Sequence, residues 1–205
     1  VRLLDLEGRE LVHVAARGSE PEALAPLESS APAEEIAARA SALARGQVYV
    51  SQFDLSRDEH GAVVAPWKPV IRFAAPAVDG AGRPAGLLVL DYVGVSVLRF
   101  VYQTGLQVPG WTALIDADGH FLGAPQGEPP WTRAFSKVPG FAEHHPRAWN
   151  ALSGERVAEH FDERGLYVYG RVPTPQHRDA AISDLEVAAV CHVPAQEIYA
   201  ASRST

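Results

Sequence analysis

The stretch from Trp67 to Tyr92 constrains the fold more than any other part of the chain. It contains two strand-like segments, Val70 to Val78 and Leu87 to Val93. The segment between them is rich in residues that favour tight turns: Asp79, Gly80, Gly82, Pro84 and Gly86. The stretch therefore predicts two strands that pair as an antiparallel hairpin.

The register of this hairpin gives the first functional clue. If Val78 pairs with Ala85, then Arg72 lies opposite Asp91, on the face that also carries Val70, Leu87 and Val89. Two charged groups on an apolar sheet face need partners, because burying an unpaired charge is costly. They pair either with each other or with a bound molecule, so the pattern indicates a structural ion pair or a binding site.

Composition limits the classes of protein that need to be considered. The chain has 205 residues, 47% of them hydrophobic and 21% charged, which is typical of a globular protein with one large or two small domains. Its net charge of −7 argues against nucleic acid as a partner. We expect no cofactor and no bound metal. The chain starts directly in strand-like sequence, which indicates a fragment of a longer protein.

The first half of the chain predicts two strands, a helix and three further strands. Arg2 to Leu4 and Glu10 to Val14 form a hairpin, residues 16 to 31 a loop, and Pro32 to Arg45 a helix with apolar residues at helical spacing. Val48 to Phe53 alternates as a strand and leads through a polar loop into the central hairpin.

The second half repeats this order. LIDADGHFLG resembles LLDLEGRELV, and Gly154 to Asp162 resembles Gly46 to Asp54 at nearly the same offset. Between these matches, Pro146 to Leu152 predicts a helix, and strands follow at Leu166 to Val172 and Leu185 to Val193. Pro194 to Ser204 would form a final helix. The chain thus predicts two α+β units of one design, divided near Val101 to Pro109.

Nearly the whole chain resembles the double Cache family, whose members are tandem PAS-like extracytoplasmic sensor domains. The resemblance rests on GQVYVSQFDL and WKPVIRFAAPAVDGAGRPAGLLVLDYVG in the first half, and on LIDADGHFLGAP, GLYVYGRV and VAAVCHVP in the second. It implies a membrane-distal unit over residues 1–101, a membrane-proximal unit over 102–194, and a C-terminal helix over 195–205 that leads toward the membrane. Each unit would be a central antiparallel sheet flanked by helices.

The resemblance also implies a setting. Such domains lie outside the cytoplasm, in the periplasm or extracellular space, as parts of inner-membrane proteins that form homodimers. They drive a histidine kinase, a diguanylate cyclase or a chemotaxis module. The long N-terminal helix of the family and the flanking transmembrane helices are missing from this chain.

The family's usual ligand motif, which contains aromatic residues and arginine, is absent before GQVYV, where the chain reads APAEEIAARASALARG. By position, the resemblance still implies a pocket on the strand after this helix and on the hairpin: Tyr49, Ser51, Phe53, Lys68, Arg72, Asp91 and Tyr92. Tyr and Phe would form a wall, Arg72 or Lys68 would bind a carboxylate, and Asp91 would accept from an amine. A small molecule such as an amino acid or a carboxylate is the expected ligand.

Other residues suggest metal or catalytic sites, but the sequence around them does not complete the required patterns. Asp116, Asp118 and Gly119 resemble the start of a calcium loop, but the acidic pattern stops and a hairpin turn explains it. His120 and the adjacent His144 and His145 invite a zinc site, which neighbouring histidines rarely form. No phosphate loop, nucleophile elbow or zinc-hydrolase helix is present.

Three functions remain open from the sequence. The first is a ligand-sensing ectodomain without enzymatic activity, which signals through its C-terminal helix. The second is a sensor that recognises a periplasmic protein partner and binds no small ligand. The third is a hydrolase using His144 or His145, for which no nucleophile can be placed.

Overall fold

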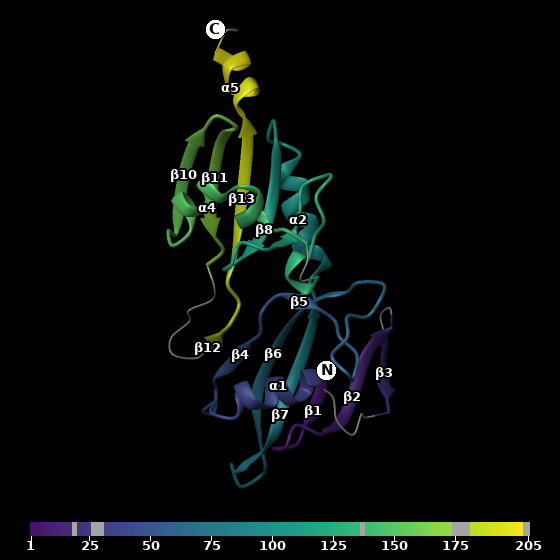
Figure 1. Cartoon of the computed structure of the whole chain (residues 1–205). Coiled ribbons are helices and arrows are strands. Elements are labelled where there is room, and N and C mark those ends of the chain that lie inside the picture. The colour runs from purple at the N-terminus through teal and green to yellow at the C-terminus, as the bar shows by residue number, and fades with distance from the viewer. Residues whose placement is uncertain (18–19, 26–30, 136–137, 174–180, 203–205) are drawn as a thin grey trace. The chain divides into compact units, whose positions relative to one another are not determined.

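The computed structural model describes residues 1–17, 20–25, 31–135, 138–173 and 181–202. The described residues form two compact units with one sheet each. Unit 1 contains Val1–Gly94 and a later segment that ends at Leu185; unit 2 begins at Val95 and contains the remaining described residues. Each unit has its own hydrophobic core. The antiparallel sheets with a few flanking helices confirm the expected α+β class (Figure 1).

The sheet of unit 1 is built around the central hairpin. Its strand order is β12-β4-β6-β7-β1-β2-β3, with β5 paired to β6. The elements are β1 (Arg2–Leu4), β2 (Glu10–Arg17), β3 (Glu20–Leu24), α1 (Ala31–Ala40), β4 (Val48–Val50), β5 (Asp54–Leu55), β6 (Pro69–Val78), β7 (Pro84–Val93) and β12 (Ala181–Ser183). Helix α1 contributes Ala33, Ile36 and Ala37 to the core, where they join Leu4, Ala74 and Val89 of the sheet.

Unit 2 has the strand order β10-β11-β13-β8-β9. Its elements are α2 (Val95–Gly105), β8 (Trp111–Asp116), β9 (Phe121–Gly123), η1 (Thr132–Ala134), α3 (Phe141–His144), α4 (Pro146–Leu152), β10 (Val157–Asp162), β11 (Gly165–Arg171), β13 (Val187–Pro194) and α5 (Ala195–Ser202). The aromatic residues Phe121, Phe141 and Tyr167 are fully buried in its core.

The two sheets share one topology. In unit 1 the order β4-β6-β7-β1-β2 corresponds strand by strand to β10-β11-β13-β8-β9 in unit 2. In both units a hairpin precedes a helix, and three corresponding strands follow in the same order: β4, β6 and β7 in unit 1, and β10, β11 and β13 in unit 2. The similarity of Gly46–Asp54 to Gly154–Asp162 marks the equivalent strands β4 and β10, and each stretch begins at a glycine with positive φ. The expected repeat of one PAS-like design is confirmed.

The other sequence match has a more local cause. Four of the described hairpin turns share one geometry, in which an aspartate Oδ1 accepts the backbone N–H groups two and four residues later. A glycine with positive φ follows each aspartate by three residues, as a G1 bulge requires. The aspartates are Asp5, Asp58, Asp79 and Asp116. The likeness of LLDLEGRELV to LIDADGHFLG therefore reports a turn type.

Some elements differ from expectation, and three of them affect the division into units or the sheet of unit 1. Part of the stretch predicted as a loop, residues 16–31, contains the edge strand β3, and residues 18–19 and 26–30 of that stretch lie outside the described residues. Helix α2 had not been predicted, although Val95, Leu98 and Tyr102 follow helical spacing. Strand β12 lies in the second half of the sequence but pairs in parallel with β4 of unit 1.

The boundary between the units consequently differs from the expected division at 101/102. Helix α2 contacts β8, so the chain passes into unit 2 at Val95. Strand β12 belongs to unit 1 because its hydrogen-bonding partner is β4. The predicted membrane-proximal stretch 102–194 thus contains a strand of the other unit.

Candidate functional site

The expected pair Arg72 and Asp91 lies on the face of the unit 1 sheet that α1 covers. The two residues are directly opposed in the β6–β7 hairpin, as predicted, although a bulge pairs Val78 with Pro84 in place of Ala85. Arg72 Nε is 3.3 Å from Asp91 Oδ1. The neighbouring positions on this face, Val70 and Val89, are buried. The side chain of Asp91 is 35% exposed and that of Arg72 only 13% exposed.

A third charged residue, Arg2, completes this cluster, and the sequence analysis did not include it. Strand β1 pairs with β7 so that Arg2 lies opposite Val89. Its Nη2 donates to Asp91 Oδ1 at 2.9 Å, a shorter contact than the one from Arg72. The Arg2 side chain is 9% exposed. Two buried guanidinium groups therefore share one carboxylate oxygen, and this set is named the arginine cluster: Arg2, Arg72 and Asp91.

The cluster continues along the sheet to Glu10 and His13. Arg2 Nε is 3.8 Å from Glu10 Oε1, and His13 Nδ1 is 3.3 Å from Glu10 Oε2. Since Glu10 is also buried, the sheet holds two cations and two carboxylates close together on one face. Such a network is favourable only when its polar atoms are satisfied.

The network is only partly satisfied by the described residues. The Nε atoms of Arg2 and Arg72 are buried and have no hydrogen-bond partner. Burial lowers the pKa of the Arg72 guanidinium, and the carboxylate of Asp91 opposes this effect. An unpaired buried donor costs about 1–3 kcal/mol, and more when it carries charge. The arginine cluster thus has hydrogen-bonding capacity that an anionic group would use.

The other predicted site residues lie at different places in unit 1. Ser51 lies beside the cluster, but its Oγ accepts the backbone N–H of Arg72 at 2.8 Å and donates to the Gln52 carbonyl. Phe53 is buried, with its ring over Gly94. Lys68 is exposed just before β6, and Tyr92 is exposed on the opposite face of the sheet because side chains alternate along β7. The structure does not bring Lys68 and Tyr92 to the cluster.

Tyr49 has a structural partner that the sequence did not indicate. It is buried under α1, and its hydroxyl donates to Asp184 Oδ2 at 2.9 Å, just after β12. Arg39 Nε lies 3.6 Å from the same oxygen. Burial raises the pKa of Tyr49, and the hydrogen bond to Asp184 raises it further. Tyr49 therefore anchors β12 to unit 1.

Replacing Tyr49 by phenylalanine is expected to destabilise unit 1 by about 1 kcal/mol, because it removes one hydrogen bond to a charged acceptor and keeps the ring. Urea unfolding followed by circular dichroism would measure the change. Tyr92→Phe is the matched control on the exposed face, with an expected change within about 0.5 kcal/mol. Equal stability of Tyr49→Phe and the parent would contradict an anchoring role.

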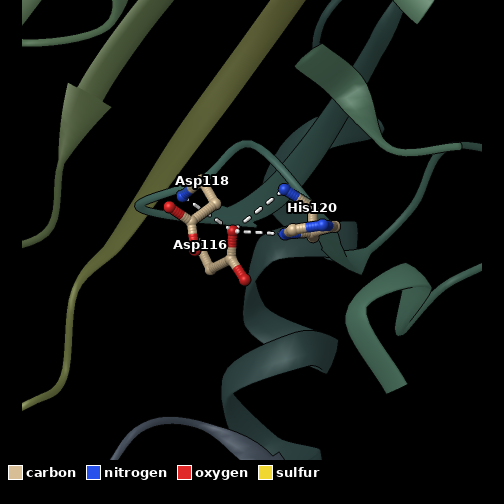
Figure 2. A group of neighbouring side chains, drawn as sticks. All are labelled: Asp116, Asp118 and His120. Atoms are coloured by element: carbon tan, nitrogen blue, oxygen red, sulfur yellow. Dashed lines mark hydrogen bonds and ion pairs between the residues drawn. The ribbon is translucent and has the colours of Figure 1, made fainter. Parts of the chain in front are cut away.

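The β8–β9 turn of unit 2 brings together Asp116, Asp118 and His120, a set that could in principle hold a metal ion (Figure 2). However, Asp116 Oδ1 already accepts the backbone N–H groups of Asp118 and His120. The Arg133 guanidinium lies 3.4 Å from Asp116 Oδ2 and 3.5 Å from Asp118 Oδ2. A side-chain cation and the turn thus use the carboxylates, in agreement with the hairpin-turn interpretation.

The two adjacent histidines have different partners. His144 Nδ1 is 3.1 Å from Glu128 Oε2, whereas His145 Nδ1 is 3.0 Å from the Tyr167 hydroxyl. Within the described residues, neither histidine is hydrogen bonded to a serine, threonine or cysteine side chain. The geometry therefore supplies no nucleophile for the hydrolase alternative.

Two tandem α+β units of one PAS-like design are the architecture expected of an extracytoplasmic sensor domain. The sequence confirms this class: residues 1–182 match the family described as bacterial histidine kinase, sensor domain. The chain belongs to this family. No curated protein matches the sequence.

Solved structures show the same fold. One is the extracellular domain of a protein described as a histidine kinase, with a TM-score of 0.76 and 17% identity over 98% of this chain and 70% of that one. Another is a domain of a protein assigned to the sensory box/GGDEF family from Vibrio parahaemolyticus, with a TM-score of 0.75 and 18% identity over 97% of this chain and 72% of that one. The fold is therefore the tandem PAS-like, double Cache fold.

Sensor domains of bacterial histidine kinases are extracytoplasmic, as the first of these neighbours illustrates. Among the helices of the described residues, none combines the length and the apolar character that crossing a membrane requires.

Proposed function

We propose that this protein is the extracytoplasmic ligand-sensing part of a membrane-anchored histidine kinase and has no enzymatic activity of its own. Unit 1 is the membrane-distal unit and binds a small carboxylate, such as an amino acid, at the arginine cluster. The single observation that carries this proposal is the pair of buried Nε donors, on Arg2 and Arg72, without a hydrogen-bond partner.

The chemistry of the cluster favours a carboxylate with a nearby amine. A guanidinium group donates in a planar fork that matches a carboxylate, so Arg72 and Arg2 would hold the acid group of the ligand. Asp91 is more exposed than either arginine and would accept from the ammonium group. Ligand binding would thereby complete a network that the protein leaves partly unsatisfied.

A short path connects this unit to the C-terminal helix. Strand β12 pairs with β4 in the sheet of unit 1, and after Asp184–Glu186 the chain enters β13, which leads into α5. A ligand that favours one arrangement of the unit 1 sheet can bias α5 through this connection. In the full receptor, which we infer to be a homodimer, α5 would pass this change to the cytoplasmic kinase.

A ligand screen with matched variants tests the site. The purified chain would be heated with amino acids, small carboxylates, amines and purines, each in excess. A ligand at 100 times its Kd adds about 2.7 kcal/mol of stability, and Arg72→Gln is expected to abolish this gain. Arg83→Gln is the control, because Arg83 lies at the exposed turn of the same hairpin and pairs with Asp79. An unchanged response in Arg72→Gln would refute the site, and mass spectrometry would reveal any ligand carried over from expression.

One observation favours the second function, recognition of a periplasmic protein partner. Leu88, Leu90 and Tyr92 are exposed along the outer face of β7, where they form an apolar stripe. Apolar side chains gathered on a surface often mark a protein interface. This function would be favoured over small-molecule sensing if no ligand in the screen stabilises the chain and if Leu90→Ser abolishes the signalling response of the receptor.

A further inference from the structure

A row of aromatic and imidazole rings crosses the sheet of unit 2. The strand register places His160 opposite Tyr167, Tyr167 opposite His192, and His192 opposite Trp111. Directly opposed residues share one face of a sheet, and the neighbouring ring centroids along the row are 6.4, 4.4 and 5.0 Å apart. His145, between α3 and α4, lies 5.5 Å from the Tyr167 ring and 5.6 Å from Trp111. Polar rings thus occupy the core of this unit.

A cavity of about 240 Å³ lies at the Tyr167 part of this row, between the start of α4 and the β10–β11 turn. Charged and imidazole groups line it together with Tyr167: His145, Arg147, Asp162, Glu163 and Arg164. All of these residues belong to unit 2, so the cavity is separate from the arginine cluster of unit 1. Its size suits a molecule of a few heavy atoms.

The contacts around His145 determine where its proton lies. Arg164 Nη1 is 3.3 Å from His145 Nδ1, and the Tyr167 hydroxyl is 3.0 Å from the same atom. Because a guanidinium group can only donate, Nδ1 is the acceptor and the neutral ring carries its proton on Nε2. Among the described residues, the His145 Nε2–H has no hydrogen-bond partner.

The carboxylates of the cavity already have partners. Arg147 Nη1 donates to Glu163 Oε1 at 2.9 Å. Asp162 Oδ1 accepts the backbone N–H of Arg164 at 2.9 Å, and its Oδ2 lies 3.7 Å from His160 Nε2. Arg164 Nη1 donates to the His144 carbonyl and lies 3.3 Å from His145 Nδ1. The donors that remain for a ligand are the other guanidinium donors of Arg147 and Arg164 and the Nε2–H of His145.

Two further atoms show that this polar row is incomplete. His160 Nε2 and His192 Nδ1 are buried without a hydrogen-bond partner, and both rings are neighbours of Tyr167 in the row. His192 as a whole is only 7% exposed. Native proteins leave few such atoms unpaired, but neither residue lines the cavity, so the two atoms mark an incompletely paired row next to Tyr167 and are not part of the binding site.

We propose that this cavity is a second small-molecule site, in unit 2, and that it binds a small carboxylate. The Arg164 guanidinium and the Nε2–H of His145 hold the carboxylate group, and the Tyr167 ring forms the wall. This site goes beyond the proposed sensing at the arginine cluster and does not depend on it.

The test uses acetate, propionate and butyrate as probes of increasing size. The chain would be titrated with each near pH 7, and the ring signals of His145 would be followed by NMR, assigned through His145→Gln. We expect saturable shifts with at least one probe. Because an anion beside the ring stabilises the imidazolium form, the titration midpoint of His145 is also expected to rise when the carboxylate is present.

Three variants decide the outcome. Arg164→Gln is expected to weaken binding by about ten-fold or more, because a charge-assisted contact is lost. Arg171→Gln, at the exposed arginine that ends β11, the strand that begins directly after Arg164, and Arg72→Gln in unit 1 should each keep the Kd within about two-fold. If Arg164→Gln does not fold, Arg164→Lys replaces it, with weaker binding expected because lysine cannot form the fork.

Three results would overturn the proposal: no saturable shift with any of the probes, parent-like binding in the Arg164 variants, or binding that disappears in Arg72→Gln. The last result would assign the carboxylate to unit 1. Binding lost only in the Arg164 variants would establish the second site even if the arginine cluster proves to have no ligand.

Discussion

Asp91→Ala is expected to destabilise unit 1 by about 3 kcal/mol, since removing one partner of a buried ion pair leaves an uncompensated charge. Two guanidinium groups depend on this carboxylate: Arg2 donates to Oδ1 at 2.9 Å, and Arg72 Nε lies 3.3 Å from the same oxygen. Both arginine side chains are largely buried and cannot turn into water without disturbing the sheet. Urea unfolding of the variant and the parent would measure the loss.

The matched control is Asp79→Ala. Asp79 lies in the turn of the same hairpin and pairs with an exposed arginine, so its loss should cost only about 1 kcal/mol. The double variant Arg72→Met/Asp91→Leu should recover part of the Asp91→Ala loss, because it replaces two charges with apolar groups. If Asp91→Ala and Asp79→Ala cost the same, the buried cluster does not support the fold.

This prediction separates two roles that the sequence left open for Arg72 and Asp91. The short contact from Arg2 makes Asp91 a structural counter-ion, whatever else it binds. The Nε atoms of both arginines are unsatisfied, but Arg72 has the longer contact to Asp91, so it is the residue whose loss should affect ligand binding most. Both interpretations of the pair can therefore hold, each through a different arginine.

The stability of unit 2 is expected to fall in mild acid. Burial, together with the charge of Arg164, lowers the pKa of His145 from 6.5 to about 4, and burial also lowers the pKa of His192. The folded protein thus disfavours the protonated rings, whereas the unfolded chain takes up protons below its ordinary histidine pKa. The stabilisation that His145 contributes is complete above pH 6.5 and is lost as the pH falls. Below about pH 4 the ring is protonated in both states, so no further loss occurs. His145 alone should account for about 2 kcal/mol, after allowance for its partial exposure.

Urea unfolding at several pH values between neutral and mildly acidic conditions would measure this dependence through tryptophan fluorescence. His145→Phe removes the titrating ring while keeping an aromatic side chain beside Phe141, and it should flatten the pH dependence. His60→Gln changes an exposed histidine in a turn of unit 1 and should leave it unchanged. A variant without His145 that keeps the full acid sensitivity of the parent would exclude this residue as the cause.

Local patterns were sufficient for much of the fold. The Asp and Gly residues of the hairpin turns act within a few residues of each other, so β1–β2, β6–β7 and β8–β9 were predicted from short stretches. The helix α4 was predicted with its observed bounds, because Pro146 begins it and a glycine follows soon after its end. The sequence also predicted that two units share one design.

Two strands were missed, for different reasons. Strand β3 is a polar edge strand whose residues resemble a loop, since one side of it has no neighbour in the sheet. Strand β12 joins the sheet of unit 1 through β4, far away along the chain. Strand β3 forms a hairpin with the preceding strand β2 in spite of its polar sequence, whereas β12 is a strand because a distant segment supplies its hydrogen bonds, and no local pattern records that partner.

The candidate site divides in the same way. The sequence by itself determined that Arg72 faces Asp91, because the turn sets the register of the hairpin and alternation sets the face. Only the tertiary structure decided that Arg2 is the nearer partner of Asp91 and that Tyr49 binds Asp184. The physical reason is that hairpin register depends on adjacent residues, whereas the charge balance of a buried site depends on which distant strands the sheet places side by side.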